Sequence, residues 1–80
     1  MSKHIDVMDM LGFMGVDIID EEIYYEESGD TRVTLSIEST IGNGEIPINL
    51  WLGIEDILYA ETTDWEISTK NYTIKFSTED

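Results

Sequence analysis

Apolar residues between positions 2 and 15 recur with the period of an α-helix. Four of them share one face of such a helix: Ile5, Met8, Leu11 and Met14. Ser2 is a residue type preferred at a helix N-cap, and Gly15 is the type preferred just beyond a helix C-terminus. The pattern predicts an N-terminal helix that buries this face.

The segment at residues 16–27 is ambiguous by its apolar pattern alone. Val16, Ile19 and Ile23 fit one face of a helix, whereas Ile19, Ile23 and Tyr25 fit one face of a strand. The β-branched and aromatic content of the segment favours the strand. We therefore predict a strand here.

A three-residue loop at positions 28–30 would join this strand to the next one. In the resulting hairpin Tyr25 faces Val33 and Ile23 faces Leu35, so that apolar residues meet apolar residues. Turn length and side-chain pattern then agree on one register.

Residues 31–52 carry the clearest hairpin pattern in the chain. Apolar and polar residues alternate on both sides of the Asn-Gly dipeptide at 43–44, which is a preferred two-residue turn. This turn would pair Ile37 with Leu50. Pro47 cannot donate a ladder hydrogen bond, so we expect it at an open edge or a bulge.

A second hairpin is predicted near the C-terminus. A turn at positions 70–71 would place Trp65 opposite Phe76 on the apolar face. On the other face it would place Glu66 opposite Lys75, where the two charges attract each other.

The segment between the hairpins, residues 53–62, fits either a short helix or a strand, and we predict one or two helical turns. Together the elements predict an α+β architecture, with an N-terminal helix packed on a four- to five-stranded antiparallel sheet built from hairpins. Because 80 residues can close only one hydrophobic core, we predict a single acidic domain over residues 1–80.

Charge is the most unusual property of the composition. The chain has 18 Asp and Glu against four Lys and Arg, a net charge of -14, while its hydrophobic fraction of 41% is high enough for a folded core. Solubility alone calls for a net charge of only about 2 to 8 in a small domain, and the excess repulsion destabilises the folded state. Binding to DNA, RNA or an anionic membrane needs Lys and Arg, which are scarce here. The composition predicts a basic protein partner and leaves homodimer formation open.

The apolar runs are too short to span a bilayer, and the N-terminus lacks the basic-then-apolar layout of a signal peptide. We therefore expect a cytoplasmic protein. The absence of Cys excludes both disulfides and thiolate metal sites.

No catalytic or cofactor motif is present. His4 is the single histidine and is expected to be an exposed helix residue. Residues 41–45 lack the Lys and Ser/Thr of a phosphate-binding loop, and the acidic segments lack the alternating ligands of a calcium loop. Acid–base catalysis needs two carboxyl groups in unlike environments within a cleft. We predict no enzymatic activity, no metal and no cofactor.

Residues 17–30 hold seven carboxylates and no Lys, Arg or His. In a strand, Asp20, Glu22, Tyr24 and Glu26 would face outward, with neighbours about 6.6 Å apart at a rise of about 3.3 Å per residue. Neighbouring phosphates along a nucleic-acid strand are roughly 6 to 7 Å apart. The row either imitates a phosphate backbone or is an ordinary solvated acidic face.

In the predicted registers Trp51 would lie on the same outer face, with Ser36 between it and Glu22, and with Glu38 next to Asp20. An outward Trp among carboxylates has the composition of an interface hot spot. The alternative is that the following segment or a second copy of the chain covers Trp51. The candidate partner-binding residues are Asp17, Asp20, Glu21, Glu22, Tyr24, Glu26, Glu27, Asp30, Glu38 and Trp51.

In its size, its net charge and the stretch DIIDEEIYYEESGD, the chain resembles small acidic inhibitors encoded by phages and mobile elements, the DNA-mimic anti-CRISPR and anti-restriction proteins. The resemblance implies a non-catalytic inhibitor in the host-cell cytoplasm that blocks the nucleic-acid groove of a nuclease, CRISPR effector or repair enzyme. Such inhibitors share no single fold. A second function is a protein-interaction module, such as an immunity protein, an antitoxin or a phage assembly subunit. A third, a small hydrolase, would need a cleft that the sequence does not show.

Overall fold

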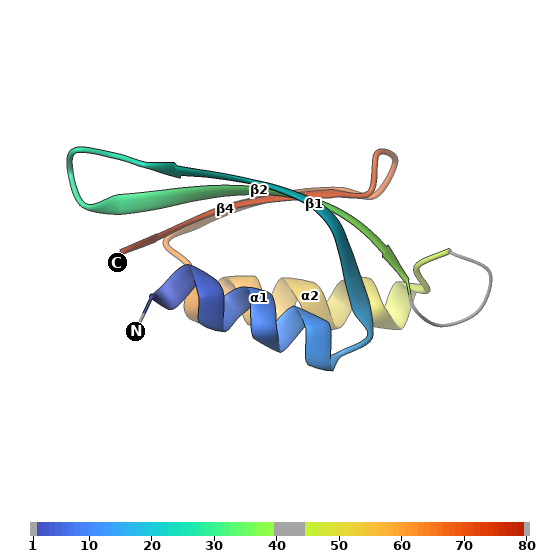
Figure 1. Cartoon of the computed structure of the whole chain (residues 1–80). Coiled ribbons are helices and arrows are strands. Elements are labelled where there is room, and N and C mark those ends of the chain that lie inside the picture. The colour runs from blue at the N-terminus through green and yellow to red at the C-terminus, as the bar shows by residue number, and fades with distance from the viewer. Residues whose placement is uncertain (1, 40–44, 80) are drawn as a thin grey trace.

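The protein folds as two helices on one face of a four-stranded antiparallel sheet (Figure 1). The computed structural model describes residues 2–39 and 45–79. In chain order the elements are α1 (Lys3–Phe13), β1 (Val16–Tyr25), β2 (Asp30–Ser39), α2 (Ile48–Glu61), β3 (Asp64–Ser68) and β4 (Thr73–Glu79). The strands are arranged in the order β1-β2-β4-β3. The predicted α+β architecture, with an N-terminal helix packed on an antiparallel sheet, is confirmed.

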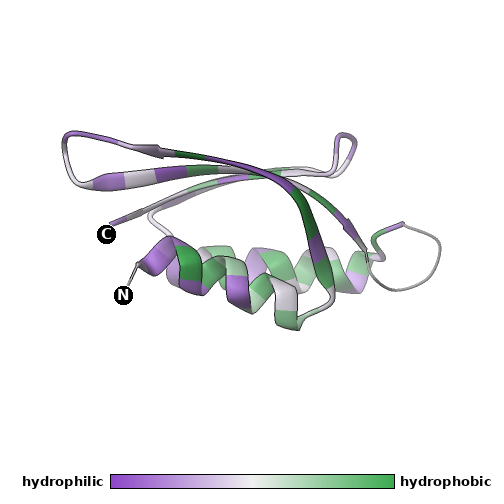
Figure 2. Ribbon diagram, in the orientation of Figure 1, coloured by the Kyte–Doolittle hydropathy of each residue, from purple (hydrophilic) through white to green (hydrophobic). Residues whose placement is uncertain are grey.

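One apolar core fills the space between the sheet and the helices. Its fully buried members come from both helices and from the two central strands: Val7, Leu11, Val33, Leu35, Ile37, Ile54, Leu58 and Ile74. Hydrophilic and hydrophobic residues alternate along the strands (Figure 2), as expected for a sheet with one face on the core and the other in solvent.

Helix α1 has the predicted ends but buries a different face. Ser2 is its N-cap, and Gly15 follows its C-cap with a φ of 99°, a conformation that glycine adopts at little cost. Its buried residues are His4, Val7 and Leu11. Ile5, which was predicted to be buried, is 49% exposed. Apolar residues surround most of this helix, so their spacing alone did not determine which side would meet the sheet.

The predicted hairpin over residues 31–52 is wrong. Strand β2 ends at Ser39, the expected turn at 43–44 lies outside the described residues, and helix α2 takes the place of the second strand. Pro47 is the N-cap of α2 rather than an edge-strand residue, and its φ of -68° suits the start of a helix. The alternation over residues 46–52 was misleading because the same residues begin a helical pattern. That pattern buries Leu50, Trp51, Ile54 and Leu58.

Because residues 45–52 supply no strand, β2 pairs with β1 on one side and with β4 on the other. Helix α2 carries the chain from β2 across the sheet to β3, which runs parallel to β2 with β4 between them. The predicted helical turns within 53–62 are confirmed as the second half of α2. The register of the C-terminal hairpin is also confirmed, with Trp65 opposite Phe76 and Glu66 opposite Lys75.

The two helices run antiparallel and touch at both ends of α1 (Figure 1). At one end the Lys3 ammonium group donates a hydrogen bond to the Glu61 carboxylate, which raises the pKa of Lys3 above its usual value. At the other end Gly53 of α2 lies against the Met14 side chain, leaving no room for a Cβ atom unless that side chain moves. Gly12 of α1, in contrast, has open space where a Cβ atom would lie.

Gly12→Ala should raise the free energy of unfolding by up to about 1 kcal/mol, because alanine loses less backbone entropy than glycine in a helix. Gly53→Ala is the comparison variant, since its Cβ atom would meet the terminal methyl group of Met14, which must move aside before the same gain is realised. Denaturant unfolding of both variants measures the difference. A larger gain at Gly53 than at Gly12 would contradict the close approach of α2 to Met14.

Candidate interaction surface

No described segment covers the face of the sheet opposite the helices (Figure 1). Alternate residues of all four strands project from it, and none of them is aliphatic. We call this the open face. Its residues are Asp17, Asp20, Glu22 and Tyr24 in β1, Arg32, Thr34, Ser36 and Glu38 in β2, Thr73, Lys75, Ser77 and Glu79 in β4, and Asp64, Glu66 and Ser68 in β3.

Carboxylates gather on β1, on the turn that follows it and at the first residue of β2. We call this group the acidic ridge: Asp17, Asp20, Glu21, Glu22, Glu26, Glu27 and Asp30. All seven are exposed or half-buried. Strand β1 is an edge strand, and the hairpin it forms with β2 extends past the helices, with hydrophilic residues at its end (Figure 2). The ridge therefore follows one free border of the molecule.

A β-bulge in β1 brings Asp17 onto the open face. In a regular strand, residues three apart point to opposite faces, yet Asp17 and Asp20 both lie opposite outward residues of β2. The register shifts by one residue between Ile18 and Asp20, which leaves Ile19 as the extra residue, 58% exposed. The bulge thereby lengthens the row of carboxylates on the open face.

The side chains of the predicted row do point to the open face. The residues of β2 predicted to lie opposite them are wrong, because the register differs by two residues. The confirmed members are Asp20, Glu22 and Tyr24. Glu22 lies opposite Thr34 rather than beside Ser36. The turn holds residues 26–29, one more than the predicted loop, and its first residue donates its N–H to the carbonyl oxygen of Asp30 over 2.9 Å. A shift of two residues leaves every side chain on the same face of the sheet. The prediction of which residues point outward is therefore correct despite the wrong register.

Glu26 and Glu38 occupy opposite ends of the hairpin and differ in their surroundings. Glu26 lies in the turn rather than in the row, and its Oε1 is 2.6 Å from the Nε of Arg32. This ion pair offsets one charge at the free end of the hairpin. Glu38 lies directly opposite Asp17, and like charges in such positions repel each other. The ion pair therefore relieves repulsion at the turn, whereas Glu38 adds to it at the bulged end of the ridge.

Trp51 does not belong to this surface. It lies on the inner side of α2, is 7% exposed, and stacks on Tyr72 with ring centroids 6.2 Å apart. The prediction of an outward Trp among carboxylates is wrong because its segment is a helix, and the chain itself covers the ring. The aromatic residue in the acidic row is Tyr24, which is 66% exposed.

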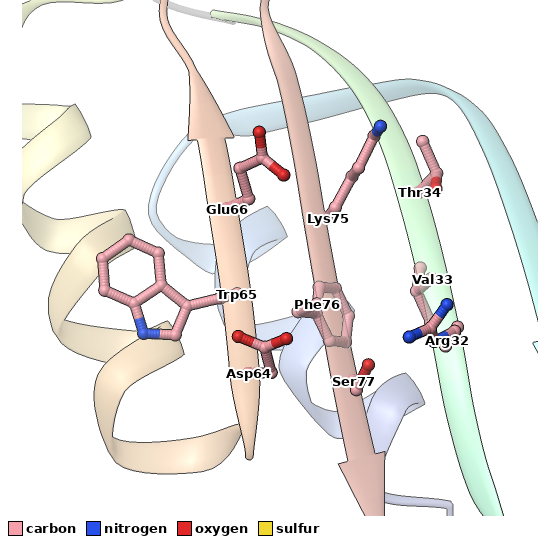
Figure 3. Close-up of a pocket in the computed structure, with 9 residues that line it drawn as sticks. All are labelled: Arg32, Val33, Thr34, Asp64, Trp65, Glu66, Lys75, Phe76 and Ser77. Atoms are coloured by element: carbon pink, nitrogen blue, oxygen red, sulfur yellow. The ribbon is translucent and has the colours of Figure 1, made fainter.

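A hollow of about 500 Å³ lies on the open face over β2, β4 and β3 (Figure 3). Its polar residues are Arg32, Thr34, Asp64, Glu66, Lys75 and Ser77. Both cations have carboxylate neighbours, since Arg32 pairs with Glu26 and Lys75 lies opposite Glu66. The hollow is therefore not arranged as an anion site. Sequence reasoning missed it because β2 and β4 were not predicted to be neighbours.

The single histidine and the described carboxyl groups lie in different surroundings, the one buried and the others outside the core. His4 is 1% exposed, contrary to prediction, and its ring packs edge-on against Tyr25 with centroids 5.9 Å apart. None of the described Asp and Glu residues is buried. Residues 2–39 and 45–79 contain no cluster of three His, Asp or Glu residues that could hold a metal ion.

Comparisons of the chain with protein-family models, with curated proteins and with solved structures found no match. Among the described residues, neither helix has the length and apolar character needed to cross a membrane. The function must therefore be inferred from the surface itself.

Asp20→Asn combined with Glu22→Gln should raise the free energy of unfolding at low salt, because the ridge loses two mutually repelling charges. The gain should shrink as NaCl approaches about 1 M, where the Debye length is about 3 Å. Asp9→Asn with Asp56→Asn is the matched control, since these exposed carboxylates lie on the helices. Denaturant unfolding at several salt concentrations measures both gains. Equal gains in the two double variants would show that repulsion is not concentrated on the ridge.

Proposed function

We propose that this protein is a non-catalytic inhibitor that occupies the nucleic-acid-binding groove of a basic host protein, such as a nuclease, a CRISPR effector or a repair enzyme. The acidic ridge is the observation that supports this proposal. It gathers seven of the 18 Asp and Glu residues on one border of the sheet. Such a strip complements a groove lined with Lys and Arg.

The spacing within the ridge supports mimicry of a phosphate backbone. Asp20 and Glu22 face the same way on β1, which corresponds to about 6.6 Å along the strand. The row begins at Asp17, because of the bulge, and ends at the exposed ring of Tyr24. A tyrosine ring adds apolar contact and can receive an Arg or Lys side chain on its face. The row thus combines repeated charge with one aromatic contact.

The charge of the whole molecule would make such binding fast and dependent on salt. A net charge of -14 attracts a basic groove from beyond contact distance and raises the association rate. It also repels nucleic acid, so the inhibitor would compete with the nucleic acid for its target without binding it.

A protein-interaction module, such as an immunity protein, an antitoxin or a phage assembly subunit, is the second candidate function. Large apolar side chains exposed on the helices favour it, since Phe13 is 93% exposed and Tyr59 is 81% exposed. Binding of this kind buries apolar area and responds little to salt. The response to salt and to competing nucleic acid therefore separates the two functions.

Mimicry predicts that the tagged protein captures a nucleic-acid-binding protein from host lysate at low salt and at about 0.15 M salt, and that duplex DNA or RNA releases it. Asp20→Lys with Glu22→Lys should weaken the captured complex by about tenfold or more, because two contacts become repulsive. Titration of the purified target with each variant measures the loss.

Asp9→Lys with Asp56→Lys supplies the control for this experiment. It makes the same change in net charge on the helices, and it should weaken the complex much less than the ridge variant. Equal weakening by both variants, or capture that competing nucleic acid does not disturb, would count against mimicry.

A further inference from the structure

Helix α2 has a second apolar side that faces solvent. Ile48, Leu52 and Tyr59 are 69%, 52% and 81% exposed, and Glu55 lies among them at another exposed position. Their spacing of four, three and four residues puts them on one side of the helix. We call them the α2 stripe. A different side of α2, about a third of a turn away, buries Leu50, Trp51, Ile54 and Leu58.

Each apolar residue of the α2 stripe is more than half exposed, so most of its surface contributes nothing to the core. The inner side of α2 already anchors the helix on the sheet, and the stripe lies in the layer away from the open face (Figure 1). An ordinary surface helix has one apolar side, on the core, and is polar elsewhere, so a second apolar side is unusual in a helix that faces solvent. Exposed apolar side chains in a row of this kind are typical of a contact with another chain.

The spacing of the stripe is that of a coiled-coil seam. The positions of Ile48, Leu52, Glu55 and Tyr59 match successive core positions of a heptad repeat. One of these positions therefore holds a carboxylate instead of an apolar side chain. A polar residue within a seam selects the partner, because only a complementary residue opposite it compensates for its burial. For Glu55 the complement is Lys or Arg.

A second copy of this chain does not supply that complement. The sequence of α2 contains no Lys or Arg. In a parallel pair of α2 helices, the two Glu55 side chains would meet directly. In an antiparallel pair centred on the stripe, each Glu55 would lie only about 2 Å along the helix from the twofold axis, at a rise of about 1.5 Å per residue. Both arrangements would place two Glu55 carboxylates close together, in two molecules that each have a net charge of -14.

We propose that the α2 stripe binds an amphipathic helix of a basic protein, with apolar residues packed on Ile48, Leu52 and Tyr59 and a Lys or Arg opposite Glu55. This binding goes beyond inhibition through the acidic ridge, because it uses the other layer of the molecule and needs no nucleic-acid-binding groove.

The test uses a synthetic helix of about three heptads with Leu at its seam positions and Lys at the central one. A peptide of the same composition with a scrambled seam is its control, so both peptides feel the same overall attraction to the acidic chain. Calorimetric titration of the full-length protein should show the seam peptide binding about tenfold more tightly than the scrambled one. Leu52→Ser with Tyr59→Ser should abolish that difference while circular dichroism stays unchanged, because both side chains are exposed.

A charge exchange tests the role of Glu55. Glu55→Lys should reverse the preference, so that a seam peptide with Glu at its centre binds about tenfold better than the peptide with Lys. Asp9→Lys, which makes the same charge change on α1, should leave the preference for Lys in place.

Three results would overturn this inference. They are equal binding of the seam and scrambled peptides, a seam preference that survives in the double Ser variant, and a dimer in sedimentation experiments that Leu52→Ser abolishes. No nucleic-acid-binding protein takes part in these measurements, so their failure would leave the proposed function intact. Failure of the capture experiment would likewise leave the stripe intact.

Discussion

The fold depends on one apolar layer between the sheet and the two helices. Leu35 and Ile74 face each other on the central strands and are fully buried, and Ile54 and Leu58 of α2 belong to the same core. A chain of this length buries only roughly 60 to 65% of its surface on folding, so the stabilisation that this layer can provide is limited. It must also offset the repulsion of a molecule with a net charge of -14. Every described carboxyl group accordingly remains outside the layer, and the strand period decides where on the surface each one appears.

The two ends of the chain could be predicted from sequence because short-range patterns decide them. Helix α1 is bounded by Ser2 and Gly15, and the β3–β4 hairpin has a single register that pairs apolar with apolar residues. The middle of the chain could not be predicted in this way. Residues 46–52 alternate like a strand and also begin a helix, and the choice depends on whether β4, far away in sequence, takes the place beside β2. Such nonlocal pairing leaves no local signal.

The candidate site was predictable to the same extent. The facing of Asp20, Glu22 and Tyr24 follows from strict alternation, which a register error of two residues preserves. The position of Asp17 depends on the bulge, which alternation does not reveal. The burial of Trp51 depends on the helix that replaced the predicted strand. Properties set by the period of one strand were thus accessible, and properties set by its partners were not.

Charged side chains on edge strands also have a general role, which is to prevent pairing with the strands of other molecules. This role accounts for Glu22 on β1 and for Glu66 on β3, since both strands are edges. It does not account for Glu27, which lies in the turn beyond the strand ladder, where there is no edge to protect. It also does not require Asp17 to share the face of Asp20. The extent of the ridge therefore exceeds what edge protection needs, and the basic partner that we propose would account for the excess.

The ridge and the α2 stripe differ in the distance over which they act. At physiological salt the Debye length is about 8 Å, so the charges of the ridge influence a partner before contact, whereas the apolar side chains of the stripe act only once water is excluded. The two surfaces belong to opposite layers of a molecule that measures 40 × 21 × 20 Å. A single straight groove cannot cover both layers, so the two proposed contacts would need either one partner that reaches around the molecule or two separate partners. In either case the proposed partners are basic proteins. Only the stripe would also require a particular arrangement of apolar side chains in its partner, so it would select more narrowly among basic proteins than the ridge.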